Sequence, residues 1–181
     1  MDTFLGVFAH ANYVHLELGL NFWDFISKLF FLQKIALICS WQSDGFVYQA
    51  DGTCKMRDRQ DLVDELGNFL VMERNGAVIG CAALQAFESD HTAEVYAFAI
   101  HPTFRGQGRG DRLLESLELA ARQRIPGIRN MFLLTTRTMD WFYQRGYTPV
   151  GPAHLSSMLP CGKKVDSSRN SKMYVKVLEE Q

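Results

Sequence analysis

The chain has 181 residues, of which 47% are hydrophobic and 12% aromatic, and its formal net charge is −1. A chain of this length forms one domain of ordinary size with a core of its own, and this composition excludes an intrinsically disordered protein. The near-neutral charge argues against a general nucleic-acid-binding or acidic-membrane-binding surface. We therefore expect a globular domain without a nucleic-acid partner.

The spacing of cysteines and histidines indicates neither disulfides nor a metal site. The four cysteines (Cys39, Cys54, Cys81 and Cys161) lie far apart and form no C-x-x-C pair. A chain this long does not need disulfides to fold, so we expect reduced thiols in a reducing compartment. The histidines lack metal-ligand spacing, which predicts no bound metal. The first 50 residues resemble neither a secretory signal nor a transit peptide, so the expected location is the cytoplasm or the chloroplast stroma.

Residues 22–41 are the most apolar stretch of the chain. Asp24, Lys28 and Lys34 interrupt it, which makes it a poor membrane-spanning helix. Its apolar residues fit one broad face of an amphipathic helix. We expect residues 1–58 to form an atypical, mainly helical segment whose apolar helix packs on the protein itself, on a partner or on a second copy. Contact with a membrane surface is the weaker alternative.

Secondary-structure patterns become clear from about residue 59, where the second predicted part of the chain (59–181) begins. After a short predicted helix at 58–66, two apolar runs, 69–73 and 77–84, are joined by an Asn-Gly turn, a strong hairpin signal. The later patterns predict, in order, strand 93–100, helix 111–124, strand 130–135, helix 138–145, strand 147–150 and strand 172–178. Strands that mix with helices in this way predict an α/β (α+β) domain around one mixed sheet.

A glycine-rich loop, His101 to Gly110, connects the predicted strand 93–100 to the helix that follows. Such a loop leaves unpaired N–H groups at the helix N-terminus, where the helix dipole favours an anion and a phosphate is the usual occupant. Glycine allows positive φ and a close approach of the backbone to a ligand. Arg105 and Arg109 flank the loop and can add positive charge. The loop fits neither a Walker loop nor a Rossmann fingerprint, and the alternative is a plain glycine-rich turn.

The string Arg105-x-x-Gly108-x-Gly110 resembles the acetyl-CoA diphosphate loop of the GNAT acyltransferases. Longer strings, Phe-Leu-Leu-Thr-Thr-Arg-Thr at 132–138 and Ser-Arg-Asn-Ser-Lys at 168–172, resemble the N-acetylglutamate synthase branch of that family. The resemblance covers about residues 59–178 and implies the GNAT fold. Two departures accompany it. Family members commonly carry an amino-acid-kinase domain upstream, which these 181 residues do not include. In addition, residues 1–58 show no clear match to the first strand and helices of a GNAT fold.

The resemblance implies acetyl-CoA as co-substrate and no metal. Backbone N–H groups of the loop are then expected to hold the diphosphate, from Arg105, Gly106, Gln107, Gly108, Arg109 and Gly110. In GNAT folds two central strands diverge where the thioester lies, and here these are 93–100 and 130–135. Backbone groups next to this divergence would contact the pantetheine arm, from Phe98, Ala99 and Ile100.

The resemblance also implies catalytic roles for two side chains. Glu94 matches the family's proposed proton acceptor, and its alternative is an ordinary exposed glutamate at a strand end. Thr135 would hydrogen-bond the amine or the developing oxyanion, and its alternative is a residue that simply favours a strand. Many family members protonate the leaving thiolate with a tyrosine at the position of Phe142, so a side-chain acid is not expected there. No cysteine stands near this chemistry, which favours direct attack of the amine on the thioester.

For the acceptor, Arg169 and Ser171 match the family's substrate-binding pair, which suits a dicarboxylate. Backbone groups near Leu84 and Ala97 would complete this site. The implied reaction is acetylation of the α-amine of L-glutamate, the first step of arginine and ornithine biosynthesis. Two alternatives stay open: a non-catalytic module that binds CoA or a partner, and a GNAT enzyme that acts on another amine.

Overall fold

The computed structural model describes residues 3–5, 65–75, 77–151, 154, 159–160 and 170–178. Its strands form one sheet with the hydrogen-bonded order β1-β2-β3-β4-β5-β7-β6. The chain divides into two compact units, one of residues 1–82 and 99–113 and the other of residues 83–98 and 114–181. A mixed sheet with few helices confirms the predicted α/β (α+β) class.

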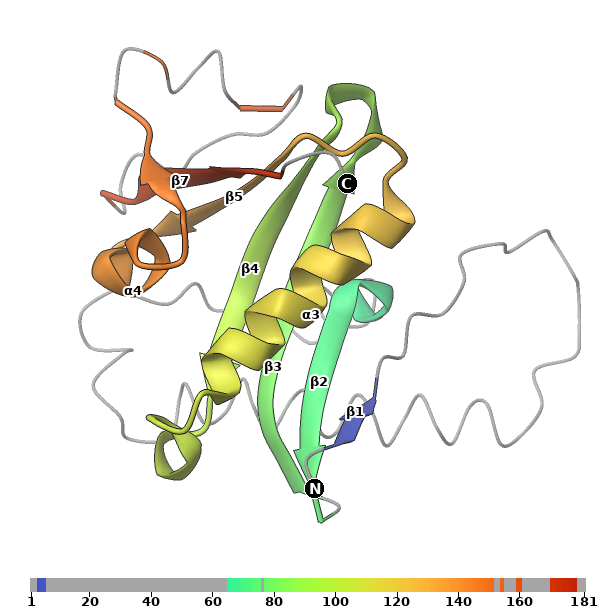
Figure 1. Ribbon diagram of the computed structural model, residues 1–181, viewed down its shortest axis with the longest axis vertical. Helices are drawn as coiled ribbons and strands as arrows, with labels where there is room; N and C mark the ends of the chain where they lie inside the picture. Colours follow the sequence, from blue (N-terminus) through green and yellow to red (C-terminus); the bar gives the residue numbers. More distant parts are fainter. Residues whose placement is uncertain are drawn as a thin grey trace, which may run out of the picture. The chain divides into compact units, whose positions relative to one another are not determined.

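The first unit begins with β1 (Thr3–Leu5), which pairs antiparallel with β2 (Phe69–Arg74) (Figure 1). The 3-10 turn η1 (Leu66–Asn68) directly precedes β2. β3 (Ala77–Phe87) follows, so the predicted hairpin is confirmed. Asn75, in the turn, has a φ of 52°, as the favoured hairpin turns require. All four residues from Phe69 to Met72 are buried, which explains the unbroken apolar run.

The sequence did not predict β1: Thr3–Leu5 form a strand, while the mainly helical character expected of residues 1–58 stays a prediction. Three residues give too short a pattern to reveal a strand, and the open edge of β2 supplies its hydrogen-bond partners. The predicted helix at 22–41 and most of the predicted helix at 58–66 lie outside the described residues.

Gly80 in β3 allows two strands of the first unit to approach closely. A Cβ atom at this position would lie 2.6 Å from Cδ1 of Ile100 and 3.1 Å from the carbonyl oxygen of Ala99. Those two residues end β4 (Thr92–Ile100) and lead directly into the glycine-rich loop. The absence of a side chain at Gly80 therefore helps to set the position where the loop begins.

In the second unit, β4 follows the 3-10 turn η2 (Glu88–Asp90) and pairs in parallel with β5 (Asn130–Thr135). β5 pairs antiparallel with β7 (Lys172–Val177), which runs beside it in Figure 1, and β7 pairs with the short β6 (Thr148–Pro149). Among the described residues, α3 (Arg109–Arg124), which begins in the first unit, and α4 (Met139–Tyr143) lie between these strands. The predicted strands and helices of this region are thus confirmed, with bounds that differ by a few residues.

The buried residues of α3 follow helical spacing, as the sequence predicted: Leu113, Leu114, Leu117, Ala120 and Ala121. The helix ends where Ile125 donates its N–H to the carbonyl of Ala121, and Pro126 and Gly127 follow. Gly127 has a φ of 67°, a conformation that glycine adopts readily after a helix. The chain then turns directly into β5.

The β5–β7 pair has two faces that carry different groups. One face holds a buried apolar cluster of Phe132, Met173 and Val175, against which Phe87 and Leu159 pack. The residues between them point the other way because side chains alternate along a strand. On that second face Lys176 of β7 forms a 2.7 Å ion pair with Glu118 of α3.

Tyr147 belongs to the same network as this ion pair and is fully buried. Its hydroxyl donates to Oε1 of Glu118 at 3.5 Å, and Nζ of Lys176 lies 5.7 Å from the centre of its ring. Burial, and then the charge and the hydrogen bond of Glu118, raise the pKa of Tyr147 well above its ordinary value.

This raised pKa predicts a loss of stability at high pH. The unfolded chain releases the tyrosine proton near pH 10 while the folded chain keeps it. The contribution of Tyr147 to the free energy of unfolding is therefore fully present below pH 10 and is lost as the pH rises further. Above about pH 10 the free energy of unfolding should fall by about 1.4 kcal/mol per pH unit more steeply in the parent protein than in Tyr147→Phe. Urea unfolding of both proteins at pH 9 and pH 11 measures this difference. Equal slopes would contradict it.

Candidate functional site

The glycine-rich loop has the backbone conformation that an anion site requires. It leaves the 3-10 turn η3 (Pro102–Phe104) and passes through Gly106 and Gly108, which have φ values of 72° and 69°. The first hydrogen bond of α3 is donated by Arg112 to the carbonyl of Gly108. The N–H groups before Arg112, that of Gly110 among them, therefore emerge from the N-terminus of a 16-residue helix. Its dipole favours a negative charge there.

Hydrogen bonds tie the start of the loop to the first unit. His101 donates its N–H to the carbonyl of Ile79 at 2.8 Å, and its ring accepts the N–H of Thr103 at 3.3 Å. Arg105 donates its N–H to the carbonyl of Pro102, so of the six predicted diphosphate donors this one is already used inside the turn. Nε of Arg105 donates to the carbonyl of Ile100 at 2.9 Å, while the side chain remains exposed.

In the second unit, the pairing of β4 with β5 supports the predicted divergence of these strands. The register of paired residues runs from Thr92–Asn130 to Val95–Leu133, although both strands continue beyond it. Two residues later Ala97 has a φ of 50°, which is rare for any residue but glycine. Strained backbone of this kind is concentrated at functional sites, and this residue, predicted for the acceptor site, lies directly before the predicted pantetheine contacts.

Of the residues predicted to contact the pantetheine arm, Phe98 is also held by aromatic packing. Its ring centre lies 5.4 Å from that of Trp141 and 5.7 Å from that of Phe142. Phe142 is only 5% exposed and packs in the core. The next two residues, Ala99 and Ile100, belong to the first unit and precede the loop.

Glu94 is buried, with only 5% of its surface exposed, so it is not an ordinary exposed glutamate. Its strand partner across the parallel pair is Phe132. Side-chain alternation places it on the same face as Thr92, two residues earlier. A buried carboxylate requires polar partners. The burial excludes the alternative of an exposed glutamate at a strand end, and the role of Glu94 as a base stays a prediction.

Thr135 is paired with Lys172 at the other end of β5, next to Ser171. Its hydroxyl lies 2.9 Å from that of Thr138 and accepts the Thr138 N–H at 3.3 Å, in the turn before α4. Alternation turns Thr135 to the face that carries Lys176, opposite to the face of Glu94. The structure therefore does not bring these two side chains together, and the contact of Thr135 with a reactant stays a prediction.

The predicted acceptor residues are only partly described. Leu84 is buried in β3, and Ser171 is half-buried immediately before β7. Asn170, which precedes Ser171, has a φ of 49° and starts the approach to the strand. Arg169 lies outside the described residues.

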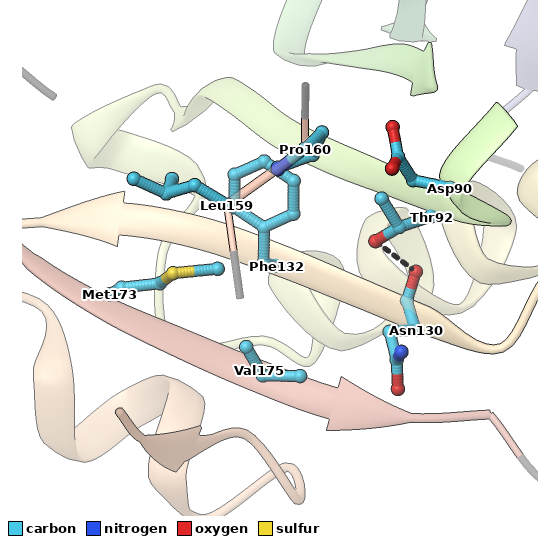
Figure 2. Close-up of a pocket in the computed structure, with 8 residues that line it drawn as sticks. All are labelled: Asp90, Thr92, Asn130, Phe132, Leu159, Pro160, Met173 and Val175. Atoms are coloured by element: carbon cyan, nitrogen blue, oxygen red, sulfur yellow. Dashed lines mark hydrogen bonds between the residues drawn. The ribbon is translucent and has the colours of Figure 1, made fainter. Parts of the chain in front are cut away.

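A pocket of about 170 Å³ opens on the Glu94 face of the second unit, and the sequence patterns did not predict it (Figure 2). Its apolar part consists of Phe132, Leu159, Pro160, Met173 and Val175. Its polar part consists of Asp90, Thr92 and Asn130, where the Thr92 hydroxyl donates to the Asn130 carbonyl at 3.0 Å. None of the predicted acceptor residues is among the described residues that line it, and none of these carries a positive charge.

The described part of the chain holds no group of three or more His, Cys, Asp or Glu side chains that could bind a metal ion. None of the helices in that part is long and apolar enough to cross a membrane.

Comparisons with known proteins show which proteins this chain resembles. Residues 65–149 match the model of the acetyltransferase (GNAT) domain. The amino-acid acetyltransferase of Azotobacter vinelandii is 38% identical over 130 residues, which cover 72% of this chain and 29% of the relative. That of Aeromonas salmonicida is 42% identical over 102 residues, which cover 56% of this chain and 23% of the relative.

Among solved structures, N-acetylglutamate synthase from Neisseria gonorrhoeae, complexed with coenzyme A and N-acetyl-glutamate, aligns with a TM-score of 0.67 and 28% identity. The alignment covers 81% of this chain and 33% of that one. This chain therefore spans about a third or less of the length of these relatives.

Proposed function

The chain carries an acetyltransferase (GNAT) domain, and from this we propose that it transfers the acetyl group of acetyl-CoA to the α-amine of L-glutamate. The single observation that carries the proposal is the loop before α3. There two glycines at positive φ lead into the N-terminus of a 16-residue helix, whose dipole favours an anion. Acetyl-CoA offers the matching diphosphate.

The choice of an amino acid as acceptor is supported by the relatives. Two of them are named amino-acid acetyltransferases, and the Neisseria enzyme was solved with N-acetyl-glutamate. The string from Ser168 to Lys172 carries an arginine and hydroxyl groups that suit two carboxylates. Arg169 and Ser171 are the proposed side-chain ligands, and backbone groups near Leu84 and Ala97 complete the site.

In the proposed mechanism Glu94 accepts the proton of the amine, directly or through one water, as the nitrogen attacks the thioester carbon. The C–N bond forms, the carbonyl becomes an oxyanion, and the C–S bond then breaks to release the thiolate, which takes up a proton from solvent. Backbone N–H groups near the end of β4 stabilise the oxyanion. Cys81, the one cysteine among the described residues, is buried in β3, which agrees with direct transfer.

Two measurements test this proposal on the purified chain. Isothermal titration with acetyl-CoA tests the co-substrate site. Mass spectrometry of reactions with glutamate, with other amino acids and with a lysine peptide tests the acceptor. Product from glutamate alone supports the proposal. Binding without any product would favour the non-catalytic module, and acetylation of the peptide alone would favour another amine as acceptor.

Replacement of Arg169 by alanine is predicted to raise the KM for glutamate by roughly 10- to 100-fold, the loss expected for a charge-assisted hydrogen bond. Affinity for acetyl-CoA should not change. Arg129→Ala is the matched control because Arg129 is exposed, precedes the opposite end of β5 and undergoes the same chemical change. Steady-state kinetics of both variants measure the effect. If Arg169→Ala weakens acetyl-CoA binding and spares glutamate, the assignment is wrong.

A further inference from the structure

The two arginines of the loop differ sharply in exposure. The Arg105 side chain is exposed, whereas Arg109, the first residue of α3, is only 7% exposed. A buried guanidinium is costly unless protein groups satisfy it. A side chain that served mainly to meet an incoming phosphate would be expected on the surface. The burial of Arg109 therefore points to partners inside the protein.

These partners lie within the loop itself. Nη1 of Arg109 donates to the carbonyl of Phe104 at 3.4 Å and to the side-chain Oε1 of Gln107. Its guanidinium carbon lies 5.3 Å from the centre of the Phe104 ring, in the range of a cation–π contact. One side chain thus connects the start of α3 to the residues on both sides of Gly106.

Through His101, the Phe104 ring connects Arg109 to β3 of the first unit. Its centre lies 5.6 Å from that of the His101 ring, and His101 is bonded through its backbone to Ile79 of β3. Arg109, Phe104 and His101 therefore form a continuous series of contacts from the helix to the sheet. Gly106 and Gly108, by contrast, have no heavy atom within 4 Å of where a Cβ would stand.

We propose that Arg109 is a positioning residue whose side chain holds the diphosphate loop in its binding conformation and does not itself contact the phosphates, while its backbone N–H remains one of the predicted diphosphate donors. Gly106 and Gly108 have more conformational freedom than any other residue type, and ordering them during binding would cost affinity. The buried guanidinium removes much of this cost, because it fixes the residues on either side of Gly106 before the ligand arrives. Arg105, exposed, is then the loop arginine available to meet a phosphate. This inference rests on the proposed function for its ligand.

The first test uses Arg109→Lys, which keeps the positive charge and loses the planar fork. Titration calorimetry should show coenzyme A affinity about 10- to 100-fold weaker than in the parent protein. Affinity for S-acetylpantetheine, which lacks the diphosphate, should not change. The slope of log Kd against log salt for coenzyme A should also stay at the parent value, because no phosphate contact is removed. Arg129→Lys, at an exposed position outside the loop, is the matched control.

The second test needs no ligand. Amide hydrogen exchange of residues 104–110 should be faster in Arg109→Lys and in Phe104→Leu, and unchanged in Arg129→Lys. Parent-like coenzyme A affinity or exchange in Arg109→Lys would overturn the inference, as would a reduced salt slope, which indicates a direct phosphate contact. If the parent protein does not bind coenzyme A, the proposed function fails, while the exchange measurement still decides whether Arg109 holds the loop.

Discussion

Replacement of Gly108 by valine is expected to abolish acetyl-CoA binding. At the Gly108 φ of 69° a β-branched side chain is strained by about 1–2 kcal/mol, so the loop would change its conformation. A Cβ there would meet no protein atom within 4 Å, so the effect does not come from a clash in the fold. The loss of binding comes from the displaced N–H groups of the loop. It also comes from the valine side chain, which would lie on the surface that the ligand must approach. Loss of two charge-assisted hydrogen bonds would weaken binding by more than about 100-fold.

Thermal unfolding with and without acetyl-CoA measures this loss. Ligand at a hundredfold excess over its Kd should stabilise the parent protein by about 2.7 kcal/mol, and the Gly108→Val protein by nothing. Gly151→Val is the matched control, because Gly151 is exposed and also has no atom within 4 Å of a Cβ position. An unchanged ligand shift in Gly108→Val would remove the loop from the acetyl-CoA site.

Replacement of Glu94 by glutamine should lower kcat by about 10²–10⁴-fold at neutral pH, the usual contribution of a positioned base. Glutamine has nearly the same shape, so the buried position should accept it without loss of the fold. Part of the activity should return as the pH rises, since more of the acceptor amine is then already deprotonated. The pH profiles of kcat for parent and variant measure both effects.

Glu88→Gln provides the control for this experiment, because Glu88 is an exposed glutamate in η2 and undergoes the same chemical change. Its kcat should match that of the parent protein. Full activity in Glu94→Gln would exclude this base. Acetyl groups found by mass spectrometry on the denatured parent protein after a brief reaction would exclude direct transfer.

The strands that surround the site could be predicted from the sequence because most of their residues are apolar. Asn130–Thr135 has the predicted bounds, and β4 begins one residue before its prediction, at Thr92. The glycine-rich loop was equally clear, since three glycines in five residues between a strand and a helix are typical of an anion-binding turn. These features depend on local sequence, and so a local pattern reveals them.

The surroundings of single polar side chains could not be predicted, because they depend on tertiary contacts. Nothing in the spacing of Arg109 distinguishes a buried side chain from a surface one, and only its contact with Phe104 reveals the difference. The burial of Glu94 likewise follows from its neighbour strand, whose Phe132 lies opposite. Thr135 matched a family position, yet its hydroxyl contacts Thr138, a local turn contact that the strand pattern did not suggest.

The parallel pairing of β4 with β5 has a consequence for the order of folding. The Thr92 hydroxyl bonds to the carbonyl of Asn130, which is 38 residues later in the chain. Closing a loop of this length costs conformational entropy before the pairing can stabilise the chain, whereas β2 and β3 need only a tight turn to pair. We expect the hairpin to form early and the β4–β5 contact late. The surroundings of Glu94 would then exist only near the end of folding, so partially folded chains should be inactive.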